Sequence, residues 1–163
     1  MEVRIEEKEA FNMIGVTKRV PIRFEGLNAE IIELAGSINT SQQELMNSLN
    51  DLYPHQVVNA SYDFDDTRFE GKGELTHMIG VLTKQQHALE ELEQLHIESG
   101  TWAIFQSTGP FPQDLQDTWG KIYTEWLPHT DYTVTTGPEI SFTRMTDTGE
   151  MKYSEIWLPI TKK

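Results

Sequence analysis

The stretch MKYSEIWLPI, residues 151–160, carries the clearest structural signal in this chain. Successive side chains of a β-strand point to opposite faces, so its residues fall into two alternating sets. One set is aliphatic and the other is aromatic with a central carboxylate: Ile156, Leu158 and Ile160 against Tyr153, Glu155 and Trp157. We expect the aliphatic set to pack under helices. Glu155 is then on the opposite, open face, although an edge-strand glutamate beside surface aromatics would give the same pattern.

The same order of elements is predicted twice along the chain. The first half contains a strand at 11–19 after a bend at Glu9–Ala10, a long or broken helix over 28–53 with Thr40 or Ser41 as N-cap, and strands near 55–63 and 75–82. In the second half, the expected elements are a strand over 101–107, an amphipathic helix over 112–126, and strands at 139–145 and 151–160.

This recurrence predicts an α+β fold. Two β-α-β-β modules related by a pseudo-two-fold axis form an antiparallel sheet, with helices on one face and a ligand cleft on the other. We expect one domain over 1–163, with halves of about 1–83 and 92–163 and a connector over 84–91.

Composition limits the classes of partner. The chain has 163 residues, 26 acidic and 13 basic side chains and no cysteine, which gives a formal net charge of −13. Such acidity repels a phosphate backbone and attracts cations, so direct nucleic-acid binding is not expected. The absence of cysteine excludes disulfides and thiol chemistry, and no signal peptide or membrane span is predicted. We therefore expect a cytoplasmic protein without membrane association.

A family resemblance is carried by several motifs of the second half. Glu98 to Phe105, Gly109-Pro110, Trp119 to Pro128, Gly137-Pro138 and Glu155 to Ile160 resemble, in order and spacing, the gyrase-inhibitor-like small-molecule-binding superfamily. That superfamily includes the effector-binding domains of AraC-type and MerR-type transcription regulators. The resemblance implies a cleft in which an acidic residue and several aromatic residues receive hydrophobic, often cationic, ligands.

The ligand-binding residues expected from the strand pattern and the resemblance are Glu155, Trp102, Trp157, Tyr153, Glu139, Trp119, Ser141 and Met145. Family members commonly carry a second glutamate on the penultimate strand, where this chain has Ser141; Glu139, two residues earlier, is a substitute on the same strand face. Trp119 is on a helical stripe typical of a core, and Met145 is a soft filler suited to an adaptable pocket.

Three functions are compatible with these residues. The leading hypothesis is a stand-alone sensor or effector-binding protein for lipophilic, cationic small molecules, held by aromatic rings and the Glu155 carboxylate. The second is a small-molecule hydrolase with Glu155 as general base, which the sequence supports less. The third is a gyrase-inhibitor-like module that binds a protein partner. The five histidines have no metal-binding spacing, so no metal or cofactor is expected.

Overall fold

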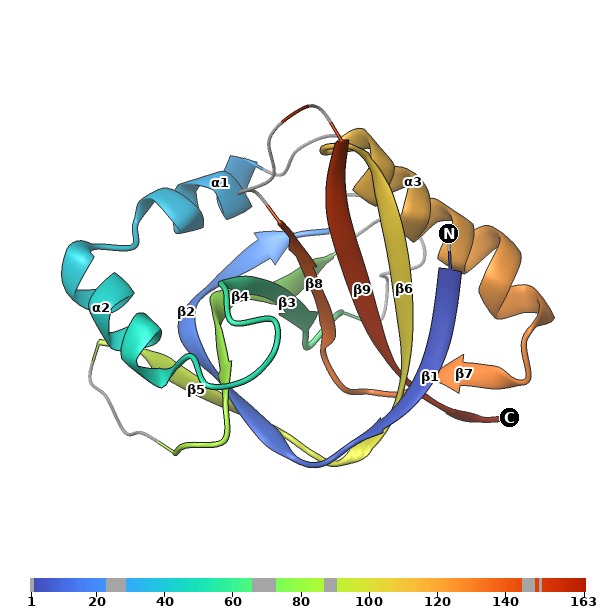
Figure 1. The fold of residues 1–163 in the computed structure, drawn as a ribbon, viewed down its shortest axis with the longest axis horizontal. Coiled ribbons are helices and arrows are strands. Elements are labelled where there is room, and N and C mark those ends of the chain that lie inside the picture. Colours follow the sequence, from blue (N-terminus) through green and yellow to red (C-terminus); the bar gives the residue numbers. More distant parts are fainter. Residues whose placement is uncertain (1, 23–28, 66–72, 87–90, 145–148, 150) are drawn as a thin grey trace. The chain divides into compact units, whose positions relative to one another are not determined.

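The computed structural model describes residues 2–22, 29–65, 73–86, 91–144, 149 and 151–163. The chain forms two compact units, which we call the N-terminal module (Glu9–Ser99) and the C-terminal module (Met1–Lys8 with Gly100–Lys163). Each contains an antiparallel sheet and the helices that pack on it (Figure 1).

The N-terminal module is built on strands in the order β3-β4-β2-β5. Its elements are β2 (Phe11–Pro21), α1 (Ala29–Gly36), α2 (Thr40–Leu49), β3 (Val58–Tyr62), β4 (Glu74–Thr83) and β5 (Glu93–Ile97). Ile14 and Val81 pack with Met46 and Leu49 of α2, so this face of the sheet and one side of the helix form a shared core.

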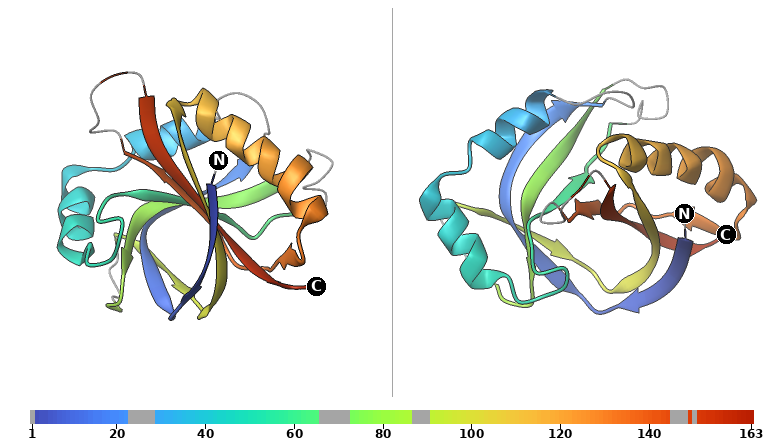
Figure 2. Two further views of the ribbon diagram at one scale, coloured as in Figure 1. Left: turned by 45° about the vertical axis from the view of Figure 1, so that its right-hand side comes forward. Right: turned by 45° about the horizontal axis from the view of Figure 1, so that its top comes forward.

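The C-terminal module has strands in the order β1-β6-β9-β8, and β7 pairs with the far end of β9. Its elements are β1 (Glu2–Lys8), β6 (Gly100–Pro110), α3 (Gln113–Lys121), β7 (Tyr132–Val134), β8 (Glu139–Thr143) and β9 (Met151–Lys162). A π-helical turn over Ile122–Trp126 and a 3-10 turn over Leu127–His129 continue α3. The views in Figure 2 show α3 lying along β6.

The two modules repeat one connectivity, which confirms the predicted β-α-β-β duplication. The order β3-β4-β2-β5 corresponds to β8-β9-β6-β1, so β2 and β6 have the same place in their sheets, as have β4 and β9. The edge strands are exchanged, however. β1 precedes β2 in the chain but pairs with β6 along its whole length, from Glu2 opposite Gln106 to Lys8 opposite Gly100. The chain thus passes from one unit to the other at Lys8–Glu9 and Ser99–Gly100, whereas the predicted halves of 1–83 and 92–163 kept β1 with the first half.

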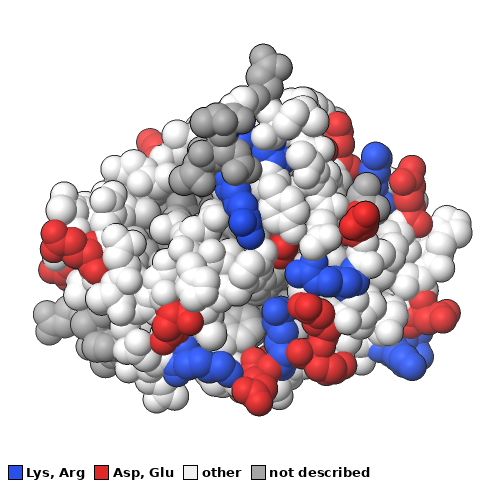
Figure 3. Space-filling view, in the orientation of Figure 1, with Lys and Arg blue, Asp and Glu red and all other residues white. Residues whose placement is uncertain are grey.

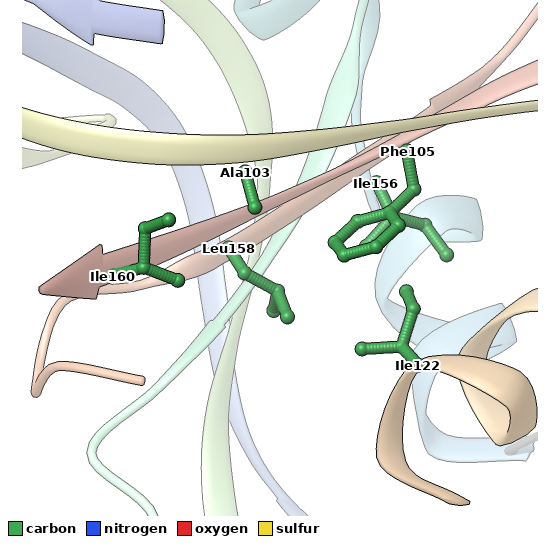
Figure 4. Packing of buried hydrophobic residues seen from close by; sticks show 6 residues of the cluster. All are labelled: Ala103, Phe105, Ile122, Ile156, Leu158 and Ile160. Atoms are coloured by element: carbon green, nitrogen blue, oxygen red, sulfur yellow. The ribbon is translucent and has the colours of Figure 1, made fainter. Parts of the chain in front are cut away.

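The core of the C-terminal module contains the aliphatic face of β9, as the sequence predicted. Figure 4 shows the buried cluster, which consists of Ala103, Phe105, Ile122, Ile156, Leu158 and Ile160. Trp119, Tyr123 and Trp126 of the helical segment pack against it. Burying each large aliphatic side chain contributes about 1.5–3 kcal/mol, so this cluster is the main apolar attachment between the helix and its sheet.

Some local predictions need correction. Of the long or broken helix predicted over 28–53, the broken form is the one observed, as the two helices α1 and α2. The N-cap of α2 is Asn39 rather than Thr40 or Ser41. Asn39 accepts a hydrogen bond from the Gln42 backbone, and the Gln42 side chain accepts one in return from the Asn39 backbone, which forms a capping box. The short strand β7 was not predicted. Among the described residues, no helix is long and apolar enough to span a membrane.

Candidate functional site

The side chains of β9 that point away from α3 define the candidate site. Strand register places Ile104 opposite Trp157 on one side of β9 and Phe142 opposite Glu155 on the other. Directly paired residues of an antiparallel sheet share a face. We call this side of the C-terminal sheet the aromatic face; it is formed by Trp102, Ile104, Phe142, Tyr153, Glu155 and Trp157.

Glu155 is at the centre of the aromatic face and is only 1% exposed. Its carboxylate accepts a hydrogen bond from the Tyr153 hydroxyl and another from the indole Nε1 of Trp157, at 2.9 Å. Burying a carboxylate is costly unless donors replace its water, and these two hydrogen bonds supply part of that compensation. The aromatic residues on either side of Glu155 in the sequence therefore also hold its charge in place.

Aromatic rings surround the Trp157 indole. Its centroid is 6.4 Å from that of Trp102 and 6.3 Å from that of Phe142, with interplanar angles of 72° and 87°. Such edge-to-face pairs present ring edges to ring faces and add to the stability gained by burial. Trp102 and Trp157 are each 2% exposed, so the aromatic face is buried and is not the open surface expected from the sequence.

Basic side chains of β1 also contact this face. The Lys8 ammonium lies 4.3 Å from the centroid of the Trp157 ring, within range of a cation–π interaction, and Arg4 Nη2 is 3.7 Å from Glu155 Oε1. Glu6, between them on the strand, pairs with both: its oxygens are 3.2 Å from Arg4 Nε and 3.5 Å from Lys8 Nζ. Burial lowers the pKa of Arg4, but its hydrogen bond to Glu6 and the charges of Glu155 and Glu6 together raise it above its ordinary value.

The role of these β1 residues was not predicted from the sequence. Arg4, Glu6 and Lys8 alternate along the strand and so share one face, a signal visible in the sequence. Their proximity to Glu155 depends on the pairing of β1 with β6, which local patterns do not reveal. On the side of the molecule seen in Figure 3, acidic and basic side chains likewise lie next to one another.

Other predicted ligand-binding residues are on the opposite face. Ser141 is paired with Ile156, and Tyr123 of the helical segment donates a hydrogen bond to Glu139, which places Ser141 and Glu139 on the side facing α3. Trp119 packs on the aliphatic core of that side. The strand therefore separates Glu139 from Glu155, and of the two glutamates Glu155 is the one on the aromatic face. Met145 lies outside the described residues.

The N-terminal module buries a polar cluster of a different kind. His77 Nε2 is 2.9 Å from Asn59 Oδ1, and its Nδ1 is 3.2 Å from the Ser61 hydroxyl. Burial lowers the pKa of His77 to about 4, so the imidazole is neutral at physiological pH. In the part of the chain that the structure describes, no group of three or more acidic or histidine side chains could hold a metal ion.

Comparison with solved structures supports the fold. The chain is similar to SAV2435 bound to tetraphenylphosphonium, with a TM-score of 0.72 and 16% identity over 99% of this chain and 94% of that one. A putative bacterial transcription regulation protein from Staphylococcus aureus has a TM-score of 0.68 and 17% identity, covering 99% of both chains. The EcmrR C-terminal domain has a TM-score of 0.66 and 15% identity, covering 99% of this chain and 98% of its own.

Comparison with curated protein sequences finds no match. A family model does match: the GyrI-like small molecule binding domain aligns with residues 1–161, nearly the whole chain. This match confirms the resemblance inferred from the motifs of the second half. The α+β architecture, the repeated connectivity and the family match agree, and the chain belongs to the GyrI-like small molecule binding domain family.

Proposed function

We propose that this GyrI-like domain binds lipophilic cations at the aromatic face of its C-terminal module, with Glu155 as the countercharge, and that it acts as a sensor or effector-binding domain. The ligand's apolar body packs against Trp102, Trp157 and Tyr153. Its positive charge is balanced by the carboxylate and by the faces of the aromatic rings.

The observation that carries the proposal is the environment of Glu155. A carboxylate that is 1% exposed, fixed by Tyr153 and Trp157 and bordered by edge-to-face rings, is prepared to receive a positive charge in an apolar setting. Lys8 already lies over the Trp157 ring, which supports the proposal that this ring accepts the positive charge of a ligand. Tetraphenylphosphonium, the compound bound to the similar SAV2435 structure, has the matching chemistry: a delocalised positive charge inside an apolar shell.

The test is calorimetric titration of tetraphenylphosphonium, and of the uncharged triphenylmethanol, into the wild type and the Glu155→Gln variant. We expect micromolar binding of the cation that weakens at least tenfold in the variant, a loss of about 1.4 kcal/mol. Binding of triphenylmethanol should change little, because it needs no countercharge. Glutamine keeps the size of the side chain and one of the two acceptor oxygens that now serve the Tyr153 hydroxyl and the Trp157 indole, so the variant removes the charge and one acceptor.

A second buried glutamate of the same module provides the matched control. Glu139 is 6% exposed and also accepts a hydrogen bond from a tyrosine, but it is on the face toward α3. Glu139→Gln removes the same charge and should leave the affinity for tetraphenylphosphonium unchanged. Equal losses in the two variants would point to long-range electrostatics, and absence of binding to the wild type would contradict the proposal.

A further inference from the structure

We infer that Lys8 is a built-in competitor of the ligand: its ammonium occupies the cation position on Trp157, and an incoming cation must displace it. This inference rests on the proposed function, since it concerns ligand access and selectivity at the same site. It assigns β1, an edge strand, a role in setting which cations bind.

The position of Lys8 is the first argument. Its Nζ lies 4.3 Å from the Trp157 ring centroid, where a ligand's positive charge would gain most from that ring. The Lys8 side chain is 23% exposed, whereas Trp157 is 2% exposed. The lysine therefore lies between solvent and a ring that is otherwise buried, and its long, flexible side chain can move without unfolding the strand.

The second argument is that the cationic side chains of β1, Arg4 and Lys8, are both paired with Glu6, whereas the contact between Arg4 and Glu155 is long. Arg4 Nη2 is 3.7 Å from Glu155, beyond hydrogen-bond distance, and Arg4 Nη1 is buried with no hydrogen-bond partner among the described residues. Glu6 pairs with both Arg4 and Lys8 and is itself 41% exposed. After displacement, Glu6 can keep Lys8 paired at the surface, so the move does not leave an isolated charge.

The third argument is local charge. Arg4, Lys8 and Arg144, whose guanidinium lies 5.2 Å from the Tyr153 ring centroid, bring three positive charges next to the carboxylates of Glu6 and Glu155, so the site has no excess negative charge to attract a weak cation. A ligand must bind the rings and the carboxylate better than Lys8 does. A large apolar body supplies that advantage and a small hydrated cation does not, which predicts selectivity for lipophilic cations.

The test is titration of tetraphenylphosphonium into wild type, Lys8→Met and Lys8→Arg. Methionine keeps the length of the side chain without its charge, so we expect affinity to rise about tenfold in Lys8→Met. Lys8→Arg retains a cation that stacks on aromatic rings and should stay within about threefold of wild type. Triphenylmethanol should bind equally to all three proteins, because it does not compete for the cation position.

Lys121→Met is the control for overall charge, because it removes one positive charge at an exposed position of α3. Lys121→Met should leave the affinity for tetraphenylphosphonium unchanged. Thermal unfolding of each variant checks that β1 remains paired. Unchanged or weaker binding in folded Lys8→Met, with Glu155-dependent binding in the wild type, would overturn the competitor role and leave the proposed function intact. If no protein binds the cation, the proposed function itself fails.

Discussion

The faces turned away from the helices differ sharply between the two modules, although the strands have the same order. In the C-terminal module this face has Trp102, Phe142, Glu155 and Trp157. In the N-terminal module, the corresponding strands β2 and β4 contribute small and flexible apolar residues: Met13, Gly15, Met78, Gly80 and Leu82. A duplicated backbone therefore has two different surfaces. Two tryptophans and a buried glutamate lie at the centre of the C-terminal one, whereas the N-terminal one, which carries Phe11 and Tyr62, has small and flexible residues at its centre.

The difference shows that two sheets with the same strand order can carry different side chains at their central strands. Gly15 is paired with Gly80, and the two strands approach so closely there that no side chain fits between them. At β6 and β9, Ile104 and Trp157 form a directly opposed pair instead, and the large indole creates a ring environment next to Glu155. The N-terminal module thus uses close backbone packing where the C-terminal module places the groups suited to a ligand.

The largest expected effect comes from adding a side chain to the glycine pair. A Cβ on Gly15 would be 2.0 Å from the Ile79 carbonyl oxygen and 2.6 Å from the Gly80 Cα, contacts with rigid backbone that cannot be relieved by a rotamer change. We expect Gly15→Ala to lower the free energy of unfolding by about 3–5 kcal/mol, measured by urea denaturation.

Gly120→Ala is the control for the glycine pair, because its Cβ would meet nothing within 4 Å. On the helical segment, alanine should stabilise by up to about 1 kcal/mol. A loss below about 1 kcal/mol for Gly15→Ala would mean that β2 and β4 can separate easily, and the contrast between the modules would then be one of side chains alone.

A smaller effect is expected from the buried polar group of the N-terminal module. His77 has a pKa of about 4 in the folded protein, against an ordinary value of 6.5. Above pH 6.5 the imidazole is neutral in both states and its contribution is fully present. Between pH 6.5 and 4 the unfolded chain binds a proton that the native state does not, so stability falls as pH falls, by about 3 kcal/mol in total.

Urea denaturation of wild type and His77→Gln at pH 7.5 and 4.5 measures this contribution. The free energy of unfolding of the wild type should fall by about 2–3 kcal/mol more than that of the variant over this interval. The comparison with the variant removes the titration of carboxylates common to both proteins. Equal pH dependence would show that the pKa of His77 is the same in the folded and unfolded protein, so that the N-terminal module would hold a buried charge at pH 4.5.

The sequence predicted the parts of this molecule that depend on local periodicity. The alternation over Tyr153 to Ile160 separated the aliphatic core from the aromatic face, and the repeated order of elements predicted the duplication. The first prediction succeeds because apolar and polar or aromatic side chains must alternate along a strand that has one face under a helix. The second succeeds because the type of each element also follows from local periodicity.

The features of the site that were not predicted depend on contacts between residues that are far apart in the sequence. The position of Lys8 over Trp157 needs the pairing of β1 with β6, which joins segments about a hundred residues apart. The side on which Glu139 lies follows from the register of β8 against β9, and a shift of one residue would reverse it. A choice between Glu139 and Glu155 was therefore not possible from spacing alone.

The smallest expected effect concerns how the helices of the two modules begin. Helix α2 starts with the Asn39–Gln42 capping box, whereas α3 follows Pro112 with no side-chain cap. Asn39→Ala leaves the Gln42 backbone N–H without its side-chain acceptor and should cost about 1 kcal/mol of stability in urea denaturation. Thr40→Ala is the control: Thr40 is the first helical residue and not the cap, so we expect a change within about 0.5 kcal/mol. If Thr40→Ala costs more than Asn39→Ala, the helix begins one residue later, as the sequence pattern alone predicted, and the structural contrast between the two helix starts is lost.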